Sequence, residues 1–332
     1  FNLSSEEIGD VMRVIMKGDA TPAQIGSVLT ALQMKGETVE ELTGAAIVMR
    51  DFAATVSLKS TQVSDSVGTG GDGASIFNVS TAASFVACAA GAVIAKHGNR
   101  AATGKSGSAD FLEAAGVNIA LSPDQVAETI DAVGVGFMFA PTHHGATRHA
   151  VGPRREIGVR TIFNLLGPLT NPAGARWQLV GVFDQSWVRP MAEAFAKLGS
   201  VHTLVVCSDD GLDEISLAEE TLVSELKNDV VTDYRISPEQ FGIQRQPLAS
   251  LVVNSANESL DLIRSVLGGG AAKRAAAAPL HRAALARRGG RPAAREKRRS
   301  RSTEPAGHAL DRRAERPAAA RGRLHHHGAP LL

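Results

Sequence analysis

The sequence predicts an α/β protein in which a small helical domain precedes a larger α/β domain with a mostly parallel sheet covered by helices. Residues 4–60 carry apolar side chains at intervals of three and four, the spacing of amphipathic helices. From Val63 onward, short apolar segments alternate with helical segments, which favours a parallel, doubly covered sheet. Most polar clusters follow a predicted strand, where ligands bind in such sheets.

The length and composition fit a globular protein. The chain has 332 residues, of which 44% are hydrophobic, enough for one large domain or two ordinary ones. Its apolar stretches are too short to span a membrane. Glu6 and Glu7 stand where a signal peptide needs a basic start, and a chain beginning at Phe1 is expected to have lost its true start. Cys88 and Cys207 lie in apolar contexts that suit small buried side chains in a reducing cytoplasm.

Three short helices are predicted in residues 1–62, which we assign to the helical domain. Ser5 is expected to cap the first helix and Thr21, before Pro22, the second, and the third helix is expected to begin at Thr38. Their apolar faces comprise Ile8, Val11, Met12, Ile15 and Met16 in the first helix, Ile25, Val28, Leu29 and Leu32 in the second, and Leu42, Ala45, Ala46 and Met49 in the third.

Residues 63–270 are assigned to the α/β domain. A helix is predicted from about Ser80 through Cys88, and an ordinary amphipathic helix over Leu260–Leu267. The predicted strands are Val63–Val67, Val93–Ala95, Gly136–Phe139, Leu179–Val182 and Thr203–Cys207.

Residues 271–332 differ from the rest in composition. They contain 16 Lys and Arg but only 4 Asp and Glu, whereas residues 1–270 contain 19 Lys and Arg and 30 Asp and Glu. The overall charge of +1 therefore conceals an acidic part and a strongly basic part of the chain. The segment consists mostly of Ala, Arg, Gly and Pro, which predicts disorder or weak helix. An arginine-rich segment suggests nucleic-acid binding. The abrupt change after Gly270 instead suggests a frameshift in a GC-rich gene, which is the interpretation we favour.

A glycine-rich loop follows the first predicted strand. Gly68-Thr69-Gly70-Gly71-Asp72 precedes Asn78-Val79-Ser80-Thr81, where a helix is predicted to begin. Glycine lets backbone N–H groups approach a phosphate, and a helix N-terminus adds positive partial charge. A tight turn and a dinucleotide-binding loop are the alternatives. Because Asp72 would repel a pyrophosphate unless it binds ribose hydroxyls or a metal's shell, the loop points to a sugar phosphate.

Three further polar clusters follow in the chain. Lys96–Arg100 and Lys105–Asp110 offer cations and hydroxyls for an anion, or a solvated loop with a helix cap. Asp209–Glu214 offers carboxylates suited to Mg²⁺ on a diphosphate, or an acidic turn. Pro141–Glu156 contains adjacent histidines and several arginines; it lacks a zinc ligand set, and its arginines suit either a carboxylate or the solvent.

Over about residues 1–270 the sequence resembles the anthranilate phosphoribosyltransferase family. The resemblance is carried by seven motifs in order: Gly68–Asp72 (GTGGD), Asn78–Thr81 (NVST), Lys96–Arg100 (KHGNR), Ser106–Asp110 (SGSAD), Gly152–Glu156 (GPRRE), Asn164–Pro172 (NLLGPLTNP) and Gly211–Glu214 (GLDE).

The resemblance implies a cytoplasmic homodimer formed through helical domains, each joined by a helical insertion around residues 155–180. It implies that phosphoribosyl pyrophosphate and anthranilate are the substrates and that Mg²⁺, as two ions, is the cofactor. The implied phosphoribosyl pyrophosphate-binding residues are Gly68, Gly71, Asp72, Asn78, Val79, Ser80, Thr81, Lys96 and Ser108. The implied anthranilate-binding residues are Gly68, Asn99 and Arg154, with His97, Pro141 and His144 along its route. The implied metal ligands are Ser80, Asp213 and Glu214; no general base is assigned.

Three departures from the family pattern stand out. Gly104 replaces a usual serine, Gly145 replaces a usual proline, and residues 271–332 replace apolar helices that cover the sheet in the family. A nucleic-acid-binding relative that uses the basic segment and a pyrimidine nucleoside phosphorylase remain the alternative functions, although membrane and nucleic-acid partners are not expected.

Overall fold

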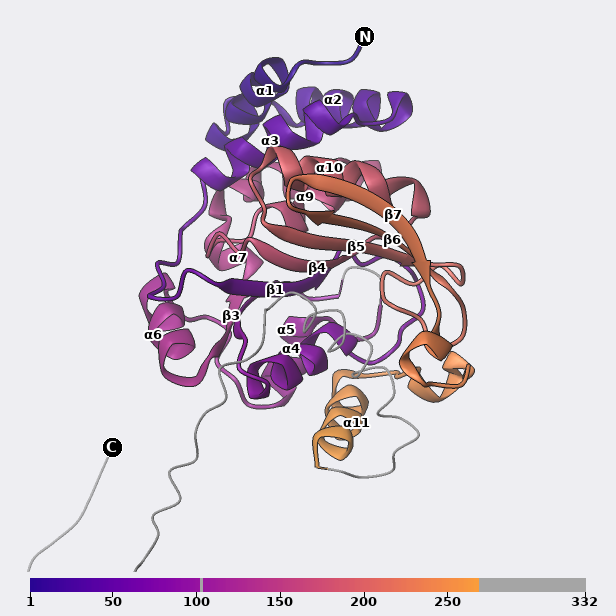
Figure 1. Ribbon diagram of the computed structural model, residues 1–332. Coiled ribbons are helices and arrows are strands. Elements are labelled where there is room, and N and C mark those ends of the chain that lie inside the picture. Colours follow the sequence, from indigo (N-terminus) through magenta and orange to yellow (C-terminus); the bar gives the residue numbers. More distant parts are fainter. Residues whose placement is uncertain (102–103, 269–332) are drawn as a thin grey trace, which may run out of the picture. The chain divides into compact units, whose positions relative to one another are not determined.

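The computed structural model describes residues 1–101 and 104–268 (Figure 1). The interpretations of residues 271–332 as a frameshifted, disordered or nucleic-acid-binding segment therefore lie outside the described residues. The helices are α1 (Ser5–Lys17), α2 (Pro22–Lys35), α3 (Val39–Asp51), α4 (Val79–Ala89), α5 (Ser108–Ala114), α6 (Pro123–Val133), α7 (Ala140–His143), α8 (Arg148–Ile157), α9 (Phe163–Leu169), α10 (Val188–Lys197) and α11 (Ala256–Leu267). The strands are β1 (Val63–Gly68), β2 (Val93–Gly98), β3 (Val135–Phe139), β4 (Trp177–Gly181), β5 (His202–Ser208), β6 (Thr221–Lys227) and β7 (Val230–Ile236).

A seven-stranded sheet forms the centre, in the order β3-β2-β1-β4-β5-β6-β7. The five strands from β3 to β5 are parallel, whereas β6 and β7 are antiparallel. The predicted fold class is confirmed. Strands β6 and β7 were not predicted from the sequence. Strand β7 is mostly exposed and therefore lacks the apolar character of a buried strand.

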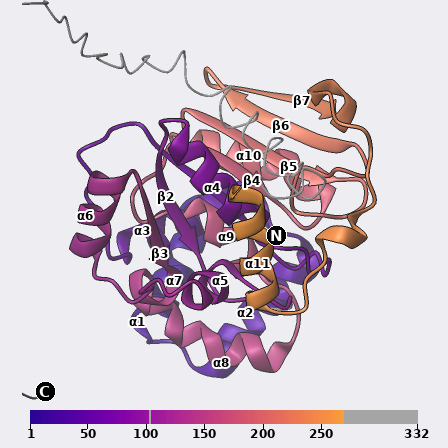
Figure 2. The ribbon, with the colours of Figure 1, turned by 90° about the horizontal axis from the view of Figure 1, so that it is seen from below.

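Apolar side chains from the two sides of the sheet enter different cores. On one side, the N-terminal helices, α9 and α10 share a cluster with β4 and β5 that includes Leu29, Phe195 and Val180 (Figure 1). On the other side, α4, α5 and α11 cover the sheet around Ile94 and Leu204, and α11 lies beside α5 (Figure 2). The sheet is therefore covered on both faces, as the alternation of strands and helices predicted.

The N-terminal helices begin where polar caps satisfy their first N–H groups. Thr21 caps α2 as predicted, in a capping box with Gln24. Thr38, where the third helix was expected to begin, is the cap of α3 and forms a capping box with Glu41. The prediction of Ser5 as the first cap is wrong: Ser4 caps α1 and forms a capping box with Glu7. Ser4 is the cap because Glu7 stands three residues after it, and the side chain of each accepts a hydrogen bond from the backbone N–H of the other.

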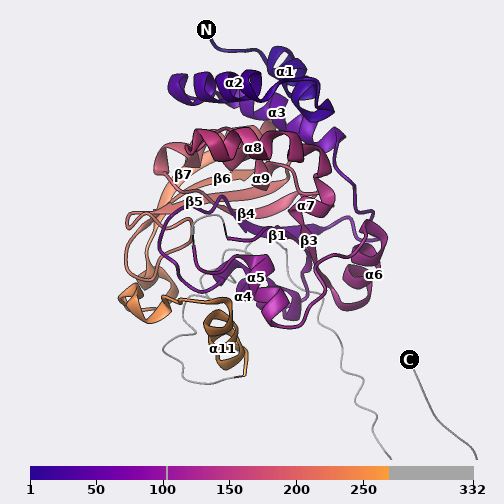
Figure 3. The ribbon, with the colours of Figure 1, turned by 180° about the vertical axis from the view of Figure 1, so that it is seen from behind.

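Two later helices pack with the N-terminal bundle. Helix α8 contacts α1 and α2, and α9 contacts α3 (Figure 3). The range 155–180, expected as a helical insertion, contains the end of α8 and all of α9, but its last residues belong to β4, which begins at Trp177. These residues pair with both β1 and β5 in the centre of the sheet, so pairing overrides a helical assignment there.

We predict that Gly44→Ala destabilises the protein by about 1–3 kcal/mol, because overpacking strains a close contact. A Cβ at Gly44 of α3 would overlap the backbone carbonyl of Ser5 in α1. Urea denaturation measures the change. The matched control is Gly26→Ala in α2, whose Cβ would meet Ile157 at an ordinary 3.9 Å. The control is expected to stabilise the helix by about 0.5–1 kcal/mol, and equal destabilisation by both variants would contradict the packing argument.

Candidate active site

A cavity of about 360 Å³ lies at the carboxyl ends of β1 and β2. Each segment that enters it comes from a loop after a strand, the start of a helix, or the α8–α9 region. The lining comprises residues 67–72, 75–80, 96–101 and 104–108 together with Ala140, Arg154, Phe163, Asn164, Gly167, Pro168, Asp213 and Glu214. This is the position where parallel α/β sheets bind ligands, because consecutive loops diverge there and leave a crevice.

The glycine loop after β1 adopts a conformation that needs glycine. Gly70 and Gly71 have φ angles of 65° and 88°, which other L-residues adopt only with strain. Thr69 anchors the loop, because its N–H donates to the Gly181 carbonyl at 2.9 Å. The next N–H group, that of Gly70, donates to Asp213 Oδ2 at 2.7 Å. The loop is thus held by neighbouring segments at the edge of the cavity.

Helix α4 directs its N-terminus into the same cavity. The N-terminal residue Asn78 does not cap the helix with its side chain. Instead its Nδ2 donates to the Ser106 carbonyl at 2.9 Å, and its Oδ1 accepts from Ser106 Oγ at 2.9 Å and Ser259 Oγ at 2.8 Å. The first turn of α4, with Ser80, therefore offers the positive end of the helix dipole to an anion in the cavity.

Lys96, near the end of β2, places a cation in the wall of the cavity. Its side chain is buried, and Nζ donates to the Ser66 carbonyl at 2.6 Å and to Ser80 Oγ at 3.2 Å. Burial lowers the pKa of Lys96, whereas the negative charges of Asp65, Glu214 and Asp213 raise it. Those carboxylates therefore help to retain the ammonium charge where an anionic ligand would meet it.

Two glycines make room for Asp213 on the opposite wall. A Cβ at Gly68 would overlap the Asp213 carboxylate, and a Cβ at Gly181 would overlap its backbone carbonyl. Burial raises the pKa of Asp213 to about 8, and the neighbouring charges of Glu214 and Asp72 raise it further. Carboxylates crowded in this way favour a cation, which would relieve their mutual repulsion.

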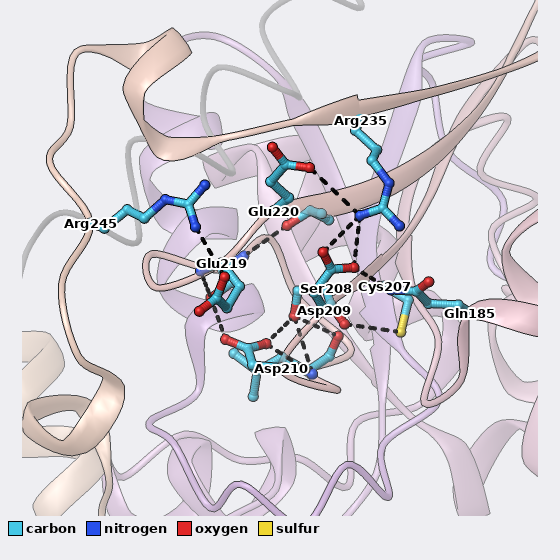
Figure 4. Close-up of polar contacts among 12 residues, drawn as sticks. Gln185, Cys207, Ser208, Asp209, Asp210, Glu219, Glu220, Arg235 and Arg245 are labelled. Atoms are coloured by element: carbon cyan, nitrogen blue, oxygen red, sulfur yellow. Dashed lines mark hydrogen bonds and ion pairs between the residues drawn. The ribbon is translucent and has the colours of Figure 1, made fainter.

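The acidic loop after β5 is held in shape by Asp210 (Figure 4). Asp210 accepts hydrogen bonds from Ser208 Oγ, from Ser216 Oγ at 2.6 Å and from the Leu212 N–H at 3.4 Å. These bonds connect the end of β5 with the residues on both sides of Asp213. Asp210 therefore acts within the loop and is not among the residues that line the cavity.

Arginines pair with the outer carboxylates of the same region (Figure 4). Arg235 on β7 donates to both oxygens of Asp209, at 2.7 and 2.8 Å, and Arg245 binds Glu219 at 3.0 Å. These exposed pairs add little stability individually. Their arrangement matters more, because it assigns cations to the outer carboxylates while Asp213 and Glu214 border the cavity.

The lining also contains Arg154 and His97, a neutral histidine with a second neutral histidine, His144, packed against it. The Arg154 guanidinium lies 5.1 Å from the centre of the Phe163 ring, and burial lowers its pKa. The rings of His97 and His144 lie 5.1 Å apart. Burial, reinforced by neighbouring histidines, lowers their pKa values to about 3 and about 4. Within the described chain, the Nε2 atoms of both histidines are buried without a hydrogen-bond partner.

Most of the predicted site residues meet in this cavity. The lining includes Gly68, Gly71, Asp72, Asn78, Val79, Ser80, Lys96, His97, Asn99, Ser108, Arg154, Asp213 and Glu214. Thr81, Pro141 and His144 are not in the lining. Thr81 is buried and donates to Ser108 Oγ at 3.2 Å, Pro141 follows the lining residue Ala140, and His144 lies against His97.

Several residues at the cavity were not predicted from the sequence. Phe163, Asn164, Gly167 and Pro168 line the cavity, and three of them belong to the motif NLLGPLTNP, which had received no role. That motif was the available signal. Arg160 touches the glycine loop from the segment between α8 and α9, and nothing in the sequence distinguished it from other exposed arginines. At Gly104, which departs from the family pattern, a Cβ would meet no atom within 4 Å.

The side chains at the cavity do not form a complete set of metal ligands by themselves. Among the described residues, no group of three or more His, Cys, Asp or Glu side chains is arranged to hold a metal ion. Mg²⁺ typically takes one or two carboxylates and completes its shell with water and substrate phosphate oxygens. Asp213 and Glu214 fit that partial ligand set.

The chain combines the two domains of a glycosyltransferase, a helical bundle and an α/β domain. Residues 1–53 match the family described as "Glycosyl transferase family, helical bundle domain", and residues 60–293 match "Glycosyl transferase family, a/b domain". The chain is 60% identical over 267 residues to the anthranilate phosphoribosyltransferase of Ectopseudomonas mendocina, covering 80% of this chain and 77% of that protein. It belongs to the anthranilate phosphoribosyltransferase family.

Solved structures agree with this assignment. The crystal structure of anthranilate phosphoribosyltransferase from Thermus thermophilus is 43% identical, with a TM-score of 0.82 over 86% of this chain and 85% of that chain. The Saccharomyces cerevisiae enzyme in complex with PRPP and Mg is 28% identical, with a TM-score of 0.78 over 86% of this chain and 84% of that one. Among the described residues, no helix is long and apolar enough to cross a membrane.

We predict that lowering the pH destabilises the fold through His97 and His144. Both histidines remain neutral in the folded chain down to about pH 3 and 4, whereas the unfolded chain takes up protons below about pH 6.5. The free energy of unfolding should therefore fall by about 1 kcal/mol per pH unit per histidine from pH 6.5 towards 4. Urea denaturation at several pH values measures this slope.

His144→Gln provides the control, because it removes one of the two groups. Asp65 and Asp213, whose pKa values burial raises to about 6 and about 8, act in the opposite direction but are common to both proteins, so the difference in slope between them isolates His144. The variant should lose less stability on acidification. Equal slopes for the two proteins would contradict the assignment of a buried neutral His144.

Proposed function

We propose that this protein transfers the phosphoribosyl group of phosphoribosyl pyrophosphate to the amine of anthranilate. The products are N-(5-phosphoribosyl)anthranilate and pyrophosphate, in tryptophan biosynthesis. The observation that carries this proposal is the meeting of the glycine loop, Lys96, Asp213 and Arg154 in one cavity of a chain with 60% identity to an anthranilate phosphoribosyltransferase. Each group supplies a different requirement: phosphate binding, charge neutralisation, metal binding and carboxylate binding.

The phosphoribosyl pyrophosphate site is proposed on the side of the glycine loop. Backbone N–H groups of the loop and the N-terminus of α4 suit phosphate oxygens, and Lys96 adds a full positive charge. Asp72 is suited to the ribose hydroxyls or to the hydration shell of a metal. The proposed set is Gly68, Gly71, Asp72, Asn78, Val79, Ser80, Thr81, Lys96 and Ser108, of which Thr81 acts through Ser108.

Ser80, Asp213 and Glu214 are the proposed ligands of Mg²⁺, with two ions bound together with the substrate. Burial raises the pKa of Asp213, and the neighbouring charges of Glu214 and Asp72 raise it further; this crowding of carboxylates supports a cation at this place. When bound, Mg²⁺ neutralises negative charge on the diphosphate and makes it a better leaving group. The yeast relative was solved in complex with PRPP and Mg, which supports use of the ion here.

Anthranilate is proposed to bind on the side of α8 and α9. Arg154 carries a desolvated guanidinium that suits the carboxylate of anthranilate, since a charged pair strengthens where water is excluded. Asn99 borders the same cavity, and Gly68 offers close backbone approach. His97, with Pro141 and His144 behind it, is proposed to line the route. A relative from yeast was solved in complex with 4-fluoroanthranilate.

The reaction then follows from positioning and charge. The bond from ribose C1 to the diphosphate oxygen breaks, and Lys96 stabilises the negative charge on the departing group. The anthranilate nitrogen forms the new bond to C1 and loses a proton. Because an aromatic amine is weakly basic, its nitrogen needs little deprotonation before attack, and orientation by Arg154 matters more than a strong base. Exclusion of water protects the activated sugar from hydrolysis.

A cytoplasmic homodimer is part of this proposal. The helices α1–α3 and α8 carry exposed apolar side chains at Val14, Met34, Ile47 and Val151, which suit an interface between helical domains. The helical domain is proposed to comprise residues 1–62 with α8 and α9. The nucleoside phosphorylase alternative is less well supported, because the chain is 60% identical to an anthranilate phosphoribosyltransferase. The nucleic-acid alternative depends on residues outside the described chain.

The decisive experiment measures formation of phosphoribosylanthranilate from the two substrates with and without Mg²⁺. We predict that Asp213→Ala with Glu214→Ala abolishes the reaction, a loss of at least about 1000-fold, because diphosphate charge is then uncompensated. Asp261→Ala with Glu258→Ala on α11 controls for loss of two carboxylates. Full activity in the Asp213 and Glu214 double variant would refute the metal assignment, and thymidine phosphorolysis by the native chain would favour the phosphorylase.

We also predict that Arg154→Ala raises the KM for anthranilate by about 10- to 100-fold, the effect of losing a charged hydrogen bond at a desolvated site. The KM for phosphoribosyl pyrophosphate should change far less. Steady-state kinetics with each substrate varied in turn measures both constants. Arg155→Ala, on the neighbouring position of α8, is the control, and an equal rise in both constants would count against a carboxylate clamp.

A further inference from the structure

Three consecutive residues of the glycine loop are held by three different partners. Thr69 Oγ1 accepts from the Phe183 N–H at 3.1 Å, and the Gly70 N–H donates to Asp213 Oδ2 at 2.7 Å. The Gly71 carbonyl accepts a short hydrogen bond from Arg160 Nη2. The first two partners lie in the segments that follow β4 and β5, whereas Arg160 belongs to the segment between α8 and α9.

Arg160 is itself supported by Phe183. Its guanidinium carbon lies 4.1 Å from the centre of the Phe183 ring, a close cation–π contact. Phe183 thus holds the loop twice: its backbone N–H binds Thr69, and its ring supports the arginine that binds Gly71. A planar guanidinium can stack and donate at the same time, which a lysine ammonium does less well.

The contact with Gly71 bears on anion binding. Gly71 has a φ of 88° and lines the cavity, whereas Arg160 does not line it. A peptide group that turned its carbonyl oxygen towards a diphosphate would repel it, and one that offers its N–H attracts it. Arg160 pairs the carbonyl outside the lining of the cavity and therefore keeps it from turning inward. Its positive charge also lies next to a loop proposed to bind an anion.

We propose that Arg160, supported by Phe183, is a positioning residue that fixes the glycine loop in its anion-binding conformation and thereby sets the affinity for the diphosphate substrate. This inference rests on the proposed function, because it concerns the same cavity. It assigns a role to the α8–α9 segment besides the proposed contact of Arg154 with the acceptor. Loss of Arg160 should therefore weaken the binding of phosphoribosyl pyrophosphate and leave the binding of anthranilate unchanged.

The test compares Arg160→Ala, Arg160→Lys and Phe183→Leu with the native full chain. Calorimetry measures the Kd of phosphoribosyl pyrophosphate in the presence of Mg²⁺, and steady-state kinetics measures kcat and the KM of each substrate. Thermal unfolding measures stability. Arg13→Ala is the matched control, since Arg13 is an exposed arginine on α1 paired only with Asp10 at 2.8 Å among the described residues.

Arg160→Ala should raise the Kd and KM for phosphoribosyl pyrophosphate about tenfold, the effect of one charged hydrogen bond. The KM for anthranilate and the thermal midpoint should stay close to those of the Arg13→Ala control. Arg160→Lys should restore part of the affinity, and Phe183→Leu should give about a threefold loss by removing the ring.

Unchanged affinity for phosphoribosyl pyrophosphate in Arg160→Ala would overturn the inference while leaving the proposed function intact. An equal rise in both KM values would also overturn it, because that result indicates a general structural role. If Arg160→Ala does not fold, Arg160→Lys and Phe183→Leu decide the question by the same selectivity. Failure of the native chain to bind phosphoribosyl pyrophosphate would instead refute the proposed function.

Discussion

The hydrogen bond between Asp213 and the Gly70 N–H joins the loop after β5 to the loop after β1, and the cavity depends on this link. It is possible only because Gly68 and Gly181 lack side chains where Asp213 packs. Parallel pairing of β1 with β4 and of β4 with β5 brings the ends of these strands together. A carboxylate that follows one strand can therefore hold a glycine loop that follows another.

Charge separation around the cavity follows from the same arrangement. Arginines on and after β7 pair with the outer carboxylates of the acidic loop, so that β7 contributes to this region although it lies at the edge of the sheet. Asp210 is satisfied within the loop by hydroxyl and backbone donors. Burial and the neighbouring carboxylates raise the pKa of Asp213, and this crowding favours a bound cation. Lys96 and Arg154 line the same cavity, so cationic and anionic groups face it from different elements.

Much of the candidate site could be predicted because its residues occur in short contiguous motifs that follow strands. Gly68–Asp72 and Lys96–Asn99 needed only the position of a strand end, and both segments reach the cavity. Arg160 could not be found in this way, because its partner Gly71 is 89 positions away and its side chain is exposed like that of any surface arginine. The resemblance assigned His144 to the substrate's route. In the structure its ring lies 5.1 Å from the ring of His97, tilted against it, and His97 lines the cavity whereas His144 does not, a relation that only packing decides.

Local patterns in the sequence predicted the fold class, the parallel strands, the cap at Thr21 and the chemistry of the motifs, because these depend on residues close together in the chain. Tertiary structure decided the antiparallel strands β6 and β7, the cap at Ser4, the neutral state of the buried histidines and the pairing of Arg160 with Gly71. The physical reason is that burial and contacts between distant segments set these features. Desolvation and hydrogen-bond partners are properties of the packed chain, and local spacing does not contain them.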